Sequence, residues 1–278
     1  MALARVSFPS AAIAISCSRH QPLARVHSCK SAAVVTKRRA AATVVLGAAI
    51  GLGSWELWAG GTVLAVTGVL MASSLERIQQ QDKAMECISR GMQLFSQGDV
   101  EGSLVEFDKA LELDPNQRPY LWQRGLTLYY LDRFEEGANQ FRDDVSINPN
   151  DAEEAIWCFL CEAQLYGVDE ARKRFLEVGS DRRFVMRKVF ELFHHGGDPE
   201  KILGQFDDNG GQLTFYSSLY TGLYFEAEQN ADAAKAAITA AARSFYGSRS
   251  TDYMALVAKA HCARRGWQLC EPSVAVIE

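Results

Sequence analysis

A spacing of 34 residues recurs in the middle of the chain and constrains its fold more than any other feature of the sequence. Between residues 84 and 149, residue types repeat at this distance at four positions. The repeated pairs are Gly91 and Gly125, Leu94 and Leu128, Phe107 and Phe141, and Pro115 and Pro149. A fixed period of this length is typical of stacked structural repeats. We therefore expect units that bury their apolar faces only by packing on their neighbours.

Each repeat unit is expected to contain two antiparallel helices. Apolar side chains recur at helical spacing within each half of a unit, and proline ends the second half because it cannot continue a helix. Short turns at Gly98-Asp99 and Asp132-Arg133 separate the two helices of each unit. The predicted helices span residues 84–97, 100–113, 120–131 and 134–147.

The pattern of the unit resembles the tetratricopeptide repeat, with glycine at position 8, an aromatic residue at position 24 and proline at position 32. The resemblance implies an all-α fold, a tetratricopeptide-type α-solenoid of antiparallel helix pairs. In the second unit, Arg124 and Asp144 occupy positions 7 and 27, where this repeat family has apolar residues. We expect an ion pair between these two side chains to replace the apolar contact.

The register continues beyond the two clear units. Ala171 and Phe175 fall at positions 20 and 24 of a third, degenerate copy, and Gly222 takes the position of glycine in a later pair. Further helices are predicted over residues 184–194, 199–206, 213–228, 232–245 and 251–265, the last as a capping helix. The predicted repeat domain covers residues 75–267, and residues 268–278 form a flexible tail.

Charge is distributed very unevenly along the chain, whose formal net charge is −5. Residues 1–55 contain seven Lys or Arg and no acid, so that the remainder carries 22 basic and 34 acidic residues. The beginning of the chain is also rich in Ala and Ser, which is the composition of an organelle transit peptide. Frequent serine and the alanine after the initiator methionine favour a chloroplast. We predict a transit peptide over residues 1–37.

Residues 38–74 predict a membrane anchor or a lumen-transfer segment. Two uncharged runs follow Arg38-Arg39 and are separated by Glu56. As an anchor, they form one tilted transmembrane helix or a hairpin, although each run is shorter than the roughly 20 residues of a span. As a transfer segment, the arginine pair resembles a twin-arginine signal, with cleavage near Met71-Ala72-Ser73. A soluble, buried segment is the third interpretation. The first two place the protein at the thylakoid membrane or in the lumen.

Side chains that often carry chemistry are present but lack the pattern of an active site. Cys158 and Cys161 have the spacing of a redox or zinc motif, but they fall inside a predicted helix and no second ligand pair follows. His194-His195 lies at a helix C-terminus, where the helix dipole favours cationic side chains. No glycine-rich phosphate loop or serine elbow is present. The sequence therefore predicts buried core cysteines, with no catalytic, cofactor-binding or metal site. A thiol enzyme is the competing class.

An apolar and aromatic strip is predicted along the inner face of the first helix of each unit. In the first two units, this partner-binding groove consists of Ile88, Met92, Phe95, Trp122, Leu126, Tyr129 and Tyr130. Surfaces of this composition bind peptides or helices of partner proteins. The chain's own helices or the second copy in a homodimer are the alternative occupants. No concentrated basic face is expected, which argues against nucleic acid as the main partner.

A second resemblance covers roughly residues 84–265. The segments 121–130, 148–151 and 216–224, with Trp157, are similar to the bacterial tetratricopeptide lipoproteins that serve as adaptors for a carboxyl-terminal processing protease. Chloroplast tetratricopeptide proteins look similar over the same span. The resemblance implies a non-enzymatic scaffold or adaptor for a lumenal processing protease or a photosynthetic complex. The alternative is a thylakoid membrane-embedded assembly or repair factor whose apolar segments bind membrane partners.

Overall fold

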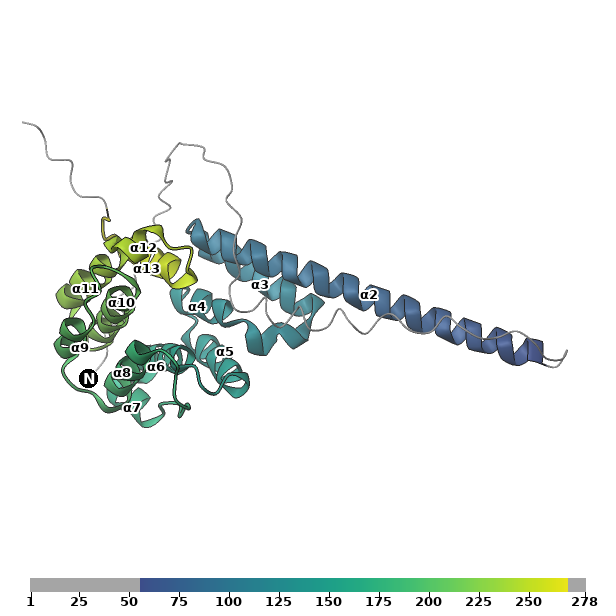
Figure 1. Ribbon diagram of the computed structural model, residues 1–278, viewed down its shortest axis with the longest axis horizontal. Coiled ribbons are helices and arrows are strands. Elements are labelled where there is room, and N and C mark those ends of the chain that lie inside the picture. Colours follow the sequence, from purple (N-terminus) through teal and green to yellow (C-terminus); the bar gives the residue numbers. More distant parts are fainter. Residues whose placement is uncertain (1–55, 270–278) are drawn as a thin grey trace, which may run out of the picture. The chain divides into compact units, whose positions relative to one another are not determined.

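A computed structural model describes residues 56–269, all within one compact unit of the chain (Figure 1). Every regular element in this range is a helix, as the all-α prediction requires. The elements are α2 (Glu56–Ser96), α3 (Val100–Leu113), η1 (Pro115–Tyr120), α4 (Trp122–Tyr130), α5 (Phe134–Ile147), α6 (Ala152–Tyr166), α7 (Val168–Lys173), α8 (Phe184–His195), α9 (Pro199–Gln205), α10 (Gln212–Ala227), α11 (Ala231–Arg243), α12 (Phe245–Arg249) and α13 (Tyr253–Arg264).

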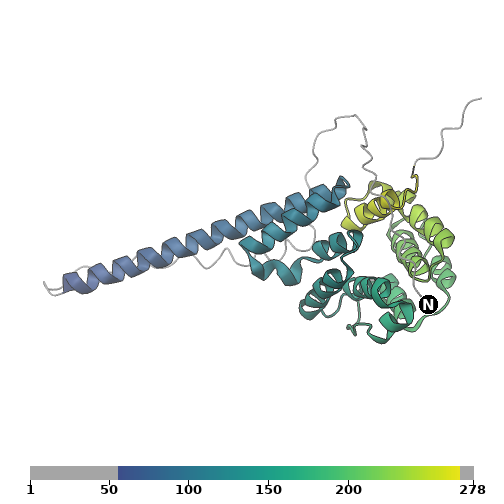
Figure 2. The same ribbon diagram turned by 180° about the vertical axis from the view of Figure 1, so that it is seen from behind.

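Helix α2 is a single helix of 41 residues. It runs without interruption across the predicted boundary between residues 74 and 75, and only its last part pairs with the 14-residue α3. Residues 74–83 are exposed, and Figures 1 and 2 show this part of α2 continuing beyond α3. The predicted transit peptide and residues 38–55 of the predicted apolar segment lie outside the described residues. Within the described range, no helix combines the length and apolar character needed to cross a membrane.

Consecutive helices pack against one another, most extensively α2 with α3, α10 with α11, and α5 with α6, and α4 also packs with α5 (Figures 1 and 2). The predicted turns separate the helices of the first two pairs. Gly98 has φ of +87° and Asp132 has φ of 57°, so both adopt the left-handed conformation that reverses the chain after a helix. Asp99 then begins α3 as its N-cap, accepting a hydrogen bond from the N–H of Gly102 at 2.8 Å.

A recurring contact joins the two helices of each pair. A Cβ atom at Gly91 would lie 2.8 Å from Cε1 of Phe107, and one at Gly125 would lie 2.6 Å from Cζ of Phe141. Gly222 faces Ile238 in the same way. In each pair the glycine allows the facing side chain to pack directly against the helix backbone. The spacing predicted from the sequence therefore corresponds to a repeated packing contact.

The third pair keeps this register with different residues. Phe159 replaces glycine and packs against Phe175, with ring centroids 5.5 Å apart. Its second helix, α7, has only six residues and ends at Lys173, so Phe175 lies just beyond the helix. The chain then runs without regular structure to α8, held in part by a 2.6 Å hydrogen bond from the N–H of Gly179 to the carbonyl oxygen of Pro149.

The last helix contacts the first pair as well as its own neighbours. Helix α13, predicted as a capping helix, packs against α11 and also against α2. One apolar core of buried residues extends from Phe95 in α2 to Cys262 in α13. A smaller core lies between α2 and α3 and includes Cys87, Phe107 and Leu121. The helix nearest the described C-terminus thus lies against the first helix pair.

Candidate functional site

The seven residues of the predicted groove lie together on α2 and α4. Three come from the C-terminal part of α2 and four from α4. Ile88, Phe95, Leu126, Tyr129 and Tyr130 are buried, whereas Met92 and Trp122 are half-buried. Ile88 belongs to the smaller core between α2 and α3, whereas the other six residues belong to the larger core or pack against it. Other helices of the same chain pack against these residues.

Helix α13 covers part of this strip, chiefly through Tyr253. The Tyr253 ring stacks on Phe95 with centroids 5.5 Å apart and meets Trp122 edge-on at 5.2 Å. The Tyr253 side chain is buried, and its hydroxyl oxygen has no hydrogen-bond partner among the described residues. Aromatic pairs in these geometries add attraction beyond the burial of apolar area. In the structure, one of the chain's own helices therefore occupies part of the strip, at Phe95 and Trp122. Binding of an external partner there stays a prediction.

A buried polar contact fixes the other end of α13. His261 is fully buried, and its Nδ1 lies 3.1 Å from the hydroxyl oxygen of Tyr130 in α4. Its Nε2 lies 2.9 Å from a carboxylate oxygen of Glu226 in α10. The Nε of Arg265 donates to the other carboxylate oxygen of Glu226 at 2.6 Å. His261 thus joins α13 to two other helices.

The electrostatics of this contact favour an ionised Glu226. Burial alone would raise the pKa of Glu226, but hydrogen bonds and charges from His261 and Arg265 outweigh it and lower the pKa to about 2. A buried carboxylate held by the His261 imidazole and the Arg265 guanidinium is geometrically specific, since moving Arg265 leaves a buried charge unpaired. The contact therefore fixes the register of α13 on the strip.

The middle of the strip continues into α6. Tyr129 packs edge-on against Trp157 of α6, with ring centroids 5.2 Å apart, and against Phe134 at 5.6 Å. Burial raises the pKa of Tyr129 far above its ordinary value, so its hydroxyl stays protonated. Tyr129 and Tyr130 are thus core residues in this structure, shared between the first three helix pairs.

The predicted ion pair of Arg124 with Asp144 is wrong. Nε of Arg124 donates to Asp108 of α3 at 2.7 Å, while its Nη1 reaches Gln140 at 3.4 Å. Gln140 in turn donates to Asp144 at 3.2 Å, so that the amide lies between the two predicted partners. Asp108 is only half a repeat away from Arg124 and lies on the preceding helix, which brings its carboxylate closer. Asp144 is left buried, and no cation pairs with it in the part of the chain that the structure describes.

Arg183, just before α8, joins three carboxylates at the start of α6. Its Nη2 lies 2.6 Å from Asp151 and 2.7 Å from Asp181, and its Nη1 bonds to Glu153. Glu153 also accepts a hydrogen bond from the hydroxyl of Tyr220 in α10. Burial alone would lower the pKa of Arg183, but these carboxylates raise it well above its ordinary value. The network ties α6, α8 and α10 together and leaves Arg183 charged.

Of the cysteines and histidines singled out in the sequence, the two cysteines are buried and His194 stacks on neighbouring rings. Cys158 and Cys161 lie buried in the middle of α6 as free thiols, and burial raises the pKa of Cys158 to about 12. A protonated thiol is a poor nucleophile. His194 stacks on Phe175 and on His195, with its Nε2 3.5 Å from Glu177. Within residues that the structure describes, no group of three His, Cys, Asp or Glu is arranged to hold a metal ion.

Sequence reasoning missed Tyr253 and His261 as residues of this site. Their helix was predicted, and Tyr253, Val257 and His261 recur at four-residue spacing along it. Their docking was not predictable, because the Tyr130–His261 contact joins residues 131 positions apart. Compared with models of known protein families, the chain has no match.

Proposed function

We propose that this chain is a non-enzymatic tetratricopeptide-type scaffold or adaptor that binds a protein partner in the chloroplast, at the thylakoid membrane or in the lumen. The proposed partner is a lumenal carboxyl-terminal processing protease or a photosynthetic complex. The repeat assignment is supported by the inter-helix contact shared by Gly91 with Phe107, Gly125 with Phe141, and Gly222 with Ile238. The location and the partner rest on the basic leader and on the resemblances in the sequence.

One observation carries the proposal: the strip on α2 and α4 already binds an α-helix. Tyr253 packs against Phe95 and Trp122, and His261 bonds to Tyr130, so the surface has both an apolar anchor site and a polar one. Grooves that take an amphipathic helix combine these features. Helix α13 thus serves as an internal model for the kind of segment that the strip accepts.

The test compares capture of the lumenal processing protease by two variants of the full chain. Tyr253→Ala removes the anchor of α13, frees part of the strip and should increase capture of a partner that binds there. Tyr224→Ala is the control, because Tyr224 is also buried and packs edge-on on Phe193 of α8, without a ring contact to the strip. Both variants should lower the melting temperature, which separates instability from exposure of the strip.

Each outcome decides one part of the proposal. Increased capture by Tyr253→Ala alone supports binding in the strip. Equal capture by the parent and both variants moves the partner to another surface. If the folded parent captures no protease, the adaptor version is discarded, and the scaffold version must then be tested against photosynthetic complexes.

A further inference from the structure

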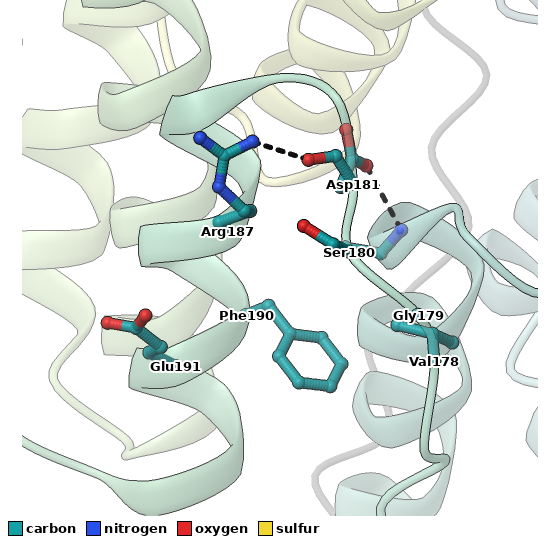
Figure 3. A pocket seen from close by; sticks show the side chains of 8 residues that line it. Val178, Gly179, Ser180, Asp181, Arg187, Phe190 and Glu191 are labelled. Carbon is teal, nitrogen blue, oxygen red and sulfur yellow. Dashed lines mark hydrogen bonds between the residues drawn. The ribbon is translucent and has the colours of Figure 1, made fainter.

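A pocket of about 290 Å³ lies between α8 and the segment that precedes it (Figure 3). Phe190, Val178 and Ala152 give it an apolar lining, while Ser180, Arg187 and Glu191 supply polar groups. In Figure 3, the Phe190 ring points from α8 towards the segment that carries Val178 and Gly179. The pocket is separate from the strip on α2 and α4 and uses none of its residues.

Arg187 is the cation of this pocket and has no acidic partner among the described residues. Its Nη1 donates to the backbone carbonyl oxygens of Asp181 at 2.5 Å and Arg182 at 3.2 Å. Its guanidinium also lies over the ring of Phe184, 5.2 Å from the centroid. These contacts hold the guanidinium in place, and the N–H groups on its other two nitrogens have no hydrogen-bond acceptor among the described residues. Arg187 is therefore oriented but not neutralised.

The acids beside Arg187 already have other partners. The carboxylate of Asp181 accepts hydrogen bonds from Arg183 and from the N–H of Ala152. Glu191 pairs with Lys188 at 2.7 Å. Neither carboxylate is needed to balance Arg187, so the positive charge at the pocket remains available to a ligand.

Two cations near the pocket have no acidic partner among the described residues. Residues 172–188 contain seven Lys or Arg and two acids, but five of these cations form ion pairs, so that Arg182 and Arg187 alone remain unpaired within the described chain. Arg182 is exposed and forms no ion pair with any residue that the structure describes. Unpaired cations of this kind attract anionic partners and speed their association.

We propose that this pocket binds an acidic peptide segment of a partner protein, with a carboxylate on Arg187 and a neighbouring apolar side chain against Phe190. Guanidinium groups recognise carboxylates with strong, charge-assisted hydrogen bonds. Because part of the lining is apolar, binding should also require an apolar side chain in the peptide, which charge attraction alone would not. The proposal rests on the protein-binding function proposed above but uses a different surface, so the two can fail independently.

The test measures fluorescence anisotropy of a fluorescein-labelled peptide of alternating glutamate and leucine, titrated with the full chain. A peptide of alternating lysine and leucine should not bind, and one of glutamate and serine should bind more weakly. Arg187→Gln should reduce affinity for the glutamate–leucine peptide about tenfold, the loss expected for one charge-assisted contact. Arg118→Gln is the control, since it removes the same charge from an exposed side chain on η1 outside the pocket.

A second variant guards against loss of structure around Arg187. Arg182→Gln changes only an exposed side chain and should weaken binding about twofold, with an unchanged melting temperature. Trp122→Ala, in the strip, should leave peptide affinity unchanged, which separates this proposal from the function of the strip. The proposal is overturned if the parent does not bind the glutamate–leucine peptide or if Arg187→Gln binds it as the parent does. Tighter binding of a single-stranded RNA oligonucleotide than of the peptide would also overturn it.

Discussion

Glycine at the helix crossings shows how single residues determine the packing of this chain. At Gly125, the facing ring of Phe141 occupies the space that a side chain would need. Helical conformation alone would favour alanine at such a position, because glycine has the higher conformational entropy when unfolded. The close approach of the two helices therefore outweighs helix propensity here.

Replacing Gly125 with alanine should lower the free energy of unfolding by about 1–3 kcal/mol, because the added Cβ would overlap the Phe141 ring. Urea denaturation of the full chain measures the effect. Gly204→Ala in α9 is the matched control, because a Cβ atom there meets nothing within 4 Å. It should leave stability unchanged or raise it by up to about 1 kcal/mol. Equal urea midpoints for Gly125→Ala and the parent would contradict this packing.

The buried carboxyl of Asp144 should make the free energy of unfolding fall as pH rises. Burial raises its pKa to about 8, helped by the charge of Asp143 and opposed by the hydrogen bond from Gln140. In the unfolded chain the carboxyl ionises near its ordinary pKa of about 4. Between these two values the folded state binds more protons, so its stability decreases across that pH window.

Asp144→Asn should therefore increase stability at pH 8 by a few kcal/mol and have a much smaller effect at pH 4. Urea midpoints at the two pH values measure this difference. Glu154, whose pKa burial also raises, keeps part of the pH dependence in the variant. Asp82→Asn is the control, because that side chain is exposed and lies on the part of α2 that precedes the core. An unchanged pH dependence in Asp144→Asn would show that Asp144 does not titrate as a buried acid.

At the scale of helices, the polar contact between α4 and α13 should be measurable as a coupling energy between Tyr130 and His261. Tyr130→Phe removes the hydroxyl that meets Nδ1 of His261, while the ring stays in place. We expect a loss of about 1–2 kcal/mol, since a buried nitrogen is left without its partner. A double-mutant cycle with His261→Ala should give a coupling energy of about 1 kcal/mol. Additive effects of the two substitutions would mean that the hydroxyl and the imidazole act independently.

Helices could be predicted from the sequence where local signals determine them. The turns at Gly98 and Asp132, the ends imposed by Pro115 and Pro149, and the apolar spacing are all features of short segments. The partner of Arg124 was mispredicted because the comparison of repeat positions does not say which of several nearby carboxylates lies closest. Helix α13 itself was predicted, but its place on the strip depends on surfaces formed by distant parts of the chain.

The same reasoning applies to the two candidate sites. The seven strip residues could be identified because they are apolar residues at helical spacing, but the contacts of Tyr253 with Phe95 and Trp122 could not be predicted. The pocket at Arg187 had no sequence signal beyond a run of basic residues. It depends on the irregular segment after α7, whose path no periodic pattern determines.

Across the described chain, contacts between α13 and the first helix pair distinguish this structure from an open array. In an open array, each repeat touches only its neighbours and the end repeats unfold first. Here Phe95 and Cys262 belong to one core. We expect backbone amides of residues 84–96 in α2 and those of α13 to exchange hydrogen as slowly as those of α4 and α6. Much faster exchange at the two ends than in the middle would contradict this expectation.

The contact between Tyr130 and His261 also sets the order in which the chain can complete its fold. A chain that emerges from a ribosome, or enters a compartment, with its N-terminus first can form the early helix pairs in sequence. Their shared apolar face stays uncovered until residues 253–264 arrive, since closing so long a loop needs the last segment to be present. During that interval the aromatic strip is open to chaperones and to other chains. Premature termination before α13 should thus produce a sticky, protease-sensitive product.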